Sequence, residues 1–229
     1  MKEKGLIARL IIRFTSGLVI VGALLFGTAG TFDWPEAWVY LVIQFGWSAG
    51  LTVFLWKHDI ELLKDRLNIS KKTAKRWDKI LSIVIIPVYV PYLVIPGFDA
   101  VRYQWSYVPL WAKVLCFGLV MLSFCWISWV MKENTYLSRF VEIQEDRGHK
   151  VITTGPYRFV RHPMYVGATV ITLSLAVALG SLYALIPAAG LVVYFVVRTA
   201  LEDKMLNNEL EGYKEYAQRT KYRLVPGIW

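Results

Sequence analysis

The stretch "MYVGATVITLSLAVALGSLYALIPAAGLVVYFVV" covers residues 164–197, which are 34 residues without a single Lys, Arg, Asp or Glu. As one helix it would rise about 50 Å, whereas the hydrocarbon core of a bilayer measures about 30 Å. Gly180 and Ser181, near its middle, are suited to a tight turn. We therefore expect a hairpin of two antiparallel membrane helices, each of them rather short for a bilayer.

The rest of the chain shares this apolar character. Of its 229 residues 56% are hydrophobic and 19% are charged, which is too apolar for an ordinary soluble domain. Further apolar blocks of membrane-helix length occupy residues 14–32, 37–56, 80–98 and 109–131. Such long blocks favour helices over the alternating strands of a membrane barrel. The first block is longer than a signal-peptide core, so we expect it to be a span. Pro87, Pro91 and Pro96 predict a kink in the third.

The positive charges predict how the chain is oriented. Lys and Arg gather in residues 1–13, 57–79, 132–162 and 198–229, whereas the intervening turns hold one of them, Arg102. By the positive-inside rule, this pattern predicts an all-α integral membrane protein with six spans and both termini in the cytoplasm. The same charges would attract anionic membrane lipids. The net charge of +9 is thereby explained, and we expect no nucleic-acid partner. The sequence indicates no protein partner.

The tail, residues 198–229, predicts an amphipathic cytoplasmic helix. Leu206, Leu210, Tyr213 and Ala217 recur at helical spacing, and we expect Gly212 to bend the helix. The chain thus divides into a four-helix membrane region, 1–131, and a C-terminal region, 132–229, that holds a polar loop, the hairpin and the tail.

The densest polar chemistry stands directly before the hairpin, in "GPYRFVRHPMYVG", residues 155–167. These residues fit a bland role, as arginines that reach lipid phosphates, aromatic residues of the interface and a proline that begins a helix. However, His162 and Tyr165 share one helix face, and interfacial anchoring needs neither a histidine nor the flanking glycines. The hairpin also returns the chain to this point, so Glu202 and Glu209 can lie nearby.

Together with "RTALEDKMLNNELEGYKEYAQRTKYRLVP" after the hairpin, this segment resembles the isoprenylcysteine carboxyl methyltransferase family, integral membrane enzymes related to the phospholipid N-methyltransferases. The resemblance covers about residues 140–226. It implies S-adenosyl-L-methionine as methyl donor, bound in a cytoplasm-facing pocket. It also implies a lipid-like or prenylated acceptor from the bilayer, with carboxylate O-methylation, as in isoprenylcysteine, as the favoured reaction. The four N-terminal spans match only in being apolar, so the acceptor stays open.

The resemblance also assigns site residues. The expected cofactor-binding set is His162, Pro163, Tyr165, Gly155, Tyr157, Glu202 and Tyr213. A carboxylate can balance the donor's sulfonium charge, and tyrosine faces can add cation–π attraction. Many relatives have two glutamates where this chain has Glu202 and Asp203, so either acid is a candidate. The expected catalytic residues are Glu202 and one of two arginines, Arg219 or Arg223, which would orient an anionic acceptor.

Other functions stay open. A sterol-reductase-like, NADPH-dependent membrane oxidoreductase has a similar C-terminal architecture, although those enzymes are usually longer. In a phospholipid amine N-methyltransferase, a carboxylate would have to accept the amine proton. A transporter or scaffold is disfavoured because the spans after Arg13 carry almost no ionisable residues. The three histidines, His58, His149 and His162, have no ligand spacing, so we expect no metal site.

Overall fold

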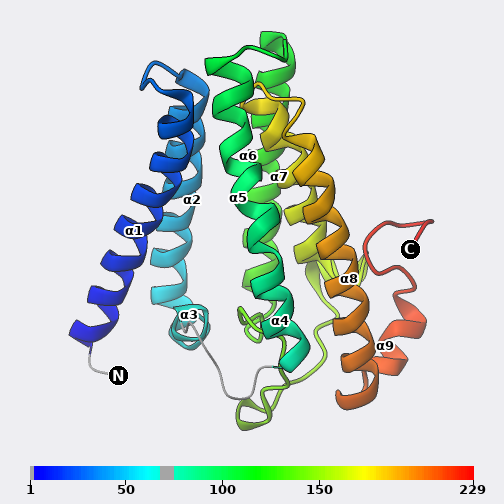
Figure 1. The fold of residues 1–229 in the computed structure, drawn as a ribbon. Coiled ribbons are helices and arrows are strands. Elements are labelled where there is room, and N and C mark those ends of the chain that lie inside the picture. Colours follow the sequence, from blue (N-terminus) through cyan, green and yellow to red (C-terminus); the bar gives the residue numbers. More distant parts are fainter. Residues whose placement is uncertain (1–2, 68–74) are drawn as a thin grey trace.

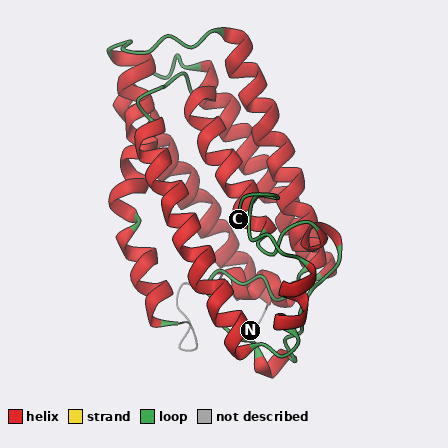
Figure 2. Cartoon of the chain, turned by 90° about the vertical axis from the view of Figure 1, so that its right-hand side faces the viewer, coloured by secondary structure: helices red, strands yellow, loops and turns green. Residues whose placement is uncertain are grey.

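A computed structural model describes residues 3–67 and 75–229, and within these ranges the chain forms helices and loops without strands (Figure 1). The longer helices stand side by side as one bundle, and the connecting loops gather at its two ends (Figure 2). The helices are α1 (Glu3–Ala29), α2 (Pro35–His58), α3 (Ile60–Leu67), α4 (Arg76–Val84), α5 (Ile86–Pro96), the π-helix η1 (Gly97–Arg102), α6 (Leu110–Glu133), the 3₁₀ helices η2 (Glu145–Arg147) and η3 (Gly155–Arg158), α7 (Pro163–Ala178), α8 (Leu185–Glu209) and α9 (Tyr213–Arg219).

Five of these segments are long and apolar enough to cross a membrane, namely α1, α2, the run from α4 to η1, α6 and α8. The chain is therefore an all-α, multi-pass integral membrane protein. α7, the sixth predicted span, has 16 residues and rises about 24 Å, so it is the short half of the predicted hairpin. It is short because residues 134–162 fold into the lower part of the bundle before the helix begins (Figure 1).

The predicted hairpin is confirmed, but the predicted tail helix is partly wrong. α7 and α8 pack against each other and are joined by a turn in which Gly180 has φ +87°. α8 then continues to Glu209, because no helix breaker lies between Val197 and Glu209, so the first part of the tail extends the helix of the last span. The expected bend occurs at Gly212, whose φ of +79° suits glycine and precedes α9.

The third block, in which the prolines predicted a kink, is broken at Ile85. α4 ends at Val84 and α5 begins at Ile86, because Pro87 lacks the N–H that would continue the hydrogen-bond ladder. Gly97 begins η1 where this segment crosses α1. A Cβ atom at Gly97 would lie 2.7 Å from the backbone nitrogen of Ala29, so the close crossing of the two helices requires glycine there.

One apolar cluster joins the spans. Its buried side chains include Leu25, Leu41, Leu93, Val120, Leu179 and Leu191. Gly167 brings α7 against α6, since a Cβ atom there would lie 2.7 Å from Cγ1 of Ile127. The amphipathic "IELLKDRL" segment forms α3, which buries Leu62 and Leu63. The rest of the basic connection, residues 68–74, lies outside the described residues.

Candidate functional site

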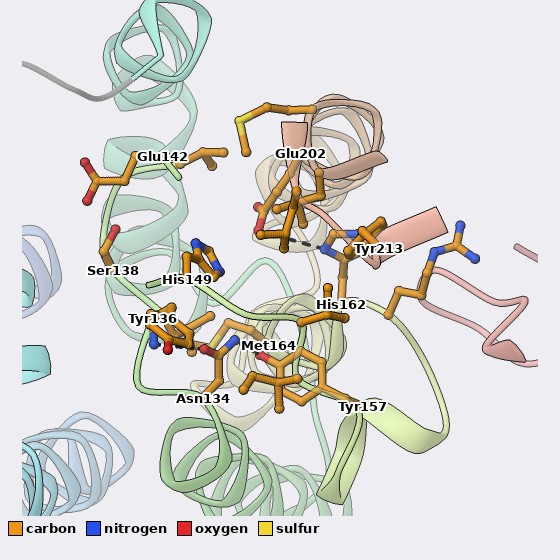
Figure 3. A pocket seen from close by; sticks show the side chains of 18 of the residues that line it. Asn134, Tyr136, Ser138, Glu142, His149, Tyr157, His162, Met164, Glu202 and Tyr213 are labelled. Atoms are coloured by element: carbon orange, nitrogen blue, oxygen red, sulfur yellow. Dashed lines mark hydrogen bonds and ion pairs between the residues drawn. The ribbon is translucent and has the colours of Figure 1, made fainter. Parts of the chain in front are cut away.

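A cavity of about 260 Å³ lies where the polar loop 134–162, the start of α7, the C-terminal half of α8 and α9 meet (Figure 3). Of the predicted site residues, the cavity is lined by Tyr157, His162, Pro163, Tyr165, Glu202 and Tyr213. Gly155 does not line it. With φ +56°, Gly155 instead lets the chain turn against Glu133 at the end of α6. Among the described residues, no group of three or more His, Cys, Asp or Glu side chains could hold a metal ion.

The start of α7 is fixed by a proline and by the C-terminal segment. Pro163 is the first residue of α7, where its missing N–H costs no hydrogen bond. The backbone N–H groups of Arg161 and His162 donate to the carbonyl oxygens of Tyr222 and Arg223, over 2.9 and 3.0 Å. Main-chain contacts therefore place His162 at the cavity.

Asp203 is the centre of a buried ion-pair network. Its carboxylate accepts hydrogen bonds from Nε and Nη2 of Arg161 at 2.7 and 3.2 Å, from Nε of Arg223 at 2.8 Å and from the Tyr213 hydroxyl at 3.0 Å. The residue is 1% exposed and does not line the cavity. A buried charge needs such partners, so Asp203 joins α8 to the loop before α7, to α9 and to the C-terminal segment.

Glu202 is the member of the acid pair that lines the cavity. Its carboxylate accepts a hydrogen bond of 2.7 Å from the Tyr165 hydroxyl, and its side chain is 20% exposed. His162 lies between the two acids, with Nε2 3.2 Å from Asp203 and Nδ1 4.0 Å from Glu202. Glu202, His162 and Tyr213 lie along the same part of the wall (Figure 3). The neighbouring acids thus have different surroundings, one tied to arginines and the other facing open space.

The loop 134–162 contributes cavity residues that the sequence analysis did not predict. The Asn134 amide donates to the Tyr157 hydroxyl over 2.7 Å, and the His149 ring stacks on Tyr136 with centroids 4.4 Å apart. Burial, followed by the positive charge of Arg147, lowers the pKa of His149 to about 4, so this imidazole is neutral at pH 7. No motif marks these positions, because they reach the cavity only through the fold of the loop.

Arg147 anchors that loop to α3. Its guanidinium lies 3.2 Å from a carboxylate oxygen of Glu61 and 3.3 Å from one of Asp65. It also donates to the carbonyl oxygen of Thr135 at 3.1 Å and to the Gln144 side chain at 2.8 Å. Arg147 therefore fixes the part of the loop that carries His149.

The structure does not bring Arg219 or Arg223 into the cavity. Arg219 is exposed, because the buried face of α9 carries Tyr213 and Tyr216. Arg223 donates to Asp203 and lies over the Trp229 ring, 5.0 Å from its centroid. The arginines that line the cavity are Arg66, Arg139, Arg161 and Arg198. Neither predicted arginine is thus placed to orient an acceptor there.

A family comparison covers the part of the chain that contains α6, α7 and α8. Residues 109–211 match the model of the phospholipid methyltransferase family, which is consistent with the resemblance to the isoprenylcysteine carboxyl methyltransferases. The match begins just before α6 and ends just after α8, so it contains His162, Tyr165, Glu202 and Asp203. No curated protein matches the chain.

Proposed function

We propose, from the premise that residues 109–211 form a region of the phospholipid methyltransferase family, that this protein transfers a methyl group from S-adenosyl-L-methionine to a lipid-like acceptor. The family match supports a membrane methyltransferase that acts on lipid-like substrates. The observation that carries the assignment of the donor site is Glu202, a carboxylate that lines a cavity at the edge of the membrane helices and has a tyrosine as hydrogen-bond donor.

The chemistry of the cavity wall fits this cofactor. When bound, S-adenosyl-L-methionine supplies an electrophilic methyl group on a positively charged sulfur. Glu202 would balance that charge, and the rings of Tyr165 and Tyr213 would add cation–π attraction. His162, oriented through Nε2 by Asp203, and neutral His149 offer hydrogen-bonding groups for a nucleoside.

Methyl transfer asks the protein mainly to position the reactants and to exclude water. The surrounding spans supply the apolar shield, and the Asp203 network fixes the residues at the start of α7. A carboxylate beside the sulfonium stabilises the bound donor at least as well as the transition state, in which that charge is already dispersing. Glu202 would therefore lower KM for the donor more than it raises kcat.

Two classes of methyl acceptor remain, and the kinetic effect of substituting Glu202 distinguishes them. A prenylated-cysteine carboxylate, the acceptor favoured by the resemblance, is a nucleophile at neutral pH and needs no base. The matched family's description names phospholipids, and the amine headgroup of a phospholipid must lose a proton, which Glu202 would have to accept. In that case Glu202→Gln would lower kcat as well as raise KM.

The cavity faces the cytoplasm in this proposal. The loop 134–162, α3 and the end of α8 all lie at one end of the bundle, and this end carries the basic segments (Figure 1). The positive-inside rule supports a cytoplasmic location for that end, with both termini on the same side. A water-soluble donor would then reach the cavity from the cytosol, whereas the acceptor would come from the inner leaflet.

The test is calorimetric titration of the full chain in detergent with two ligands, S-adenosyl-L-methionine and its neutral product S-adenosylhomocysteine. Wild-type protein should bind both. Glu202→Gln should weaken binding of the cationic donor about tenfold more than binding of the product, a difference of about 1.4 kcal/mol. Glu211→Gln, which removes an exposed carboxylate near α9, serves as the matched control and should change neither.

Failure of the folded wild-type protein to bind either ligand, repeated in lipid nanodiscs, would refute the proposal. NADPH is then the ligand to titrate, because its binding would establish the oxidoreductase alternative. If both ligands bind but Glu202→Gln weakens them equally, the site holds the donor but Glu202 does not act on the sulfonium.

A further inference from the structure

One wall of the cavity is basic, and the proposed donor chemistry does not explain it. Arg66, Arg139 and Arg198 all line this wall, and Arg13 of α1 packs against Arg66. Arg198 connects it to the acid pair, because its guanidinium lies over the ring of Tyr165, 5.9 Å from the centroid. The cavity thus has an acidic part around Glu202 and a basic part around Arg66.

The arginines are held by backbone carbonyl groups. Nη1 of Arg66 donates to the carbonyl oxygen of Leu137 over 2.9 Å, and Nη1 of Arg13 donates to that of Arg66 over 2.7 Å. Nη2 of Arg198 donates to the carbonyl oxygen of Arg139 over 3.0 Å. Each of these contacts fixes a side chain or a loop, but a carbonyl group carries no full negative charge that could compensate a guanidinium.

The four arginines differ in whether a carboxylate is paired with them. Arg198 has a carboxylate partner in Asp78, at 2.9 Å. Among the residues whose side chains are described, 5–67 and 75–229, no ion pair joins Arg13, Arg66 or Arg139 to a carboxylate. Burial, and then the positive charges of its three neighbouring arginines, lower the pKa of Arg66 to about 10. Like charges held together in this way repel each other unless an anion lies among them.

We propose that Arg13, Arg66 and Arg139 form a binding subsite for the anionic headgroup of a membrane lipid. Guanidinium groups suit this ligand, because their fork of N–H donors matches the paired oxygens of a phosphate or carboxylate. The proposal rests on the proposed function in one respect, namely that the lipid held here would be the methyl acceptor. Its headgroup would then lie between Arg66 and the donor's sulfur, within the same cavity.

Three features favour a lipid bound in the cavity over a free ion or a simple surface contact. Arg13 belongs to the membrane span α1 and is exposed on it, so this side of the subsite opens toward the bilayer. Arg66 is itself half-buried and lines the cavity, which distinguishes it from an arginine that merely reaches outward to surface phosphates. Arg13 and Arg66 also lie outside residues 109–211, so they can give this chain its own choice of acceptor.

The test is calorimetric titration of the full chain, in a neutral detergent, with dioctanoyl phosphatidylglycerol. Wild-type protein should bind this lipid, and Arg66→Gln or Arg139→Gln should each weaken binding about tenfold, since a hydrogen bond to a charged group is lost. Arg139 is exposed, so its substitution leaves the fold intact. Arg9→Gln is the matched control, because it removes an exposed arginine one turn before Arg13 on α1 and should leave binding unchanged.

Parallel titrations separate the possible anions. Inorganic phosphate should bind at least tenfold more weakly than the lipid, and equal affinity would show a free-anion site instead. If Arg66→Gln and Arg139→Gln weaken S-adenosylhomocysteine but not the lipid, the anion is the donor's own carboxylate and the proposal fails. Lipid binding that is the same in the wild type and in both variants would overturn it as well. Because donor and lipid are titrated separately, loss of the donor function would leave this result readable.

Discussion

Replacing Asp203 by asparagine should destabilise the fold, whereas replacing its neighbour Glu202 by glutamine should not. The Asp203 carboxylate receives Arg161 through two nitrogens and Arg223 through one, and it is almost completely buried. Asparagine keeps the shape but removes the charge, which leaves two guanidinium groups facing a neutral amide. Glu202 touches the open cavity and accepts one hydrogen bond from Tyr165, which glutamine can still accept.

The size of the effect follows from this geometry. Removing one partner of a buried ion pair costs about 3–5 kcal/mol, because the remaining charge loses its compensation. For a chain of this length, 1 kcal/mol shifts the melting temperature by about 2–4 °C. We therefore expect Asp203→Asn to lower Tm by about 6–20 °C. Glu202→Gln should lower it by about 2 °C or less.

The measurement is thermal unfolding in detergent, followed by the loss of monomer on size-exclusion chromatography. Titration of both variants with S-adenosyl-L-methionine, at a temperature where both are folded, completes the comparison. The reasoning is refuted if Asp203→Asn keeps the wild-type Tm but loses donor binding, while Glu202→Gln keeps donor binding. In that case the two acids have exchanged roles, and Asp203 is the acid that faces the sulfonium.

Three further outcomes are expected. Gly97→Ala should lower Tm by several degrees, because the added Cβ atom meets the backbone of Ala29. Gly118 in α6 has open space around it, so Gly118→Ala should leave Tm unchanged or raise it. Equal effects of the two substitutions on Tm would refute the close crossing of the helices. Arg219→Ala should leave donor binding and Tm unchanged, because this side chain is exposed, and a loss of donor binding would show that Arg219 acts at the cavity after all. Between pH 6.5 and 4 the unfolded chain binds a proton at His149 and the folded chain does not, so the free energy of unfolding should fall as the pH drops. His149→Gln should therefore reduce the difference in Tm between pH 7 and pH 5. An unchanged difference would refute the lowered pKa of His149.

The fold was predictable where one physical signal dominated. Residues 164–197 contain no charge and a central glycine, so a hairpin was the natural solution for a bilayer, and the structure confirms it. The end of α8 was not predictable in this way. Hydropathy marks where a chain leaves the membrane, at about Val197, but the helix ends at Glu209, just before a stretch in which Gly212 breaks the regular backbone.

The site was only partly predictable for a related reason. His162, Tyr165 and Glu202 stand in motifs next to membrane spans, so topology was enough to bring them together. The sequence did not reveal which of the two acids faces the cavity. Successive helical residues such as Glu202 and Asp203 point about 100° apart, so the rotation of the helix about its axis decides this. Arg66 and His149 come from segments distant in sequence, and their approach depends on loop contacts such as those of Arg147.

The shortness of α7 has a consequence for how a lipid could react here. One turn joins the end of α7 to the start of α8. Measured from that turn, α7 extends over 16 residues and α8 over 25, so α8 reaches well beyond the start of α7. His162 and the cavity therefore sit at a depth that the neighbouring helix passes through and continues beyond. A lipid at this depth could keep its chains among the other lipids while its head tilts sideways into the protein. The reaction would then need no extraction of the lipid from its leaflet, because the soluble donor would meet the lipid head at the edge of the membrane.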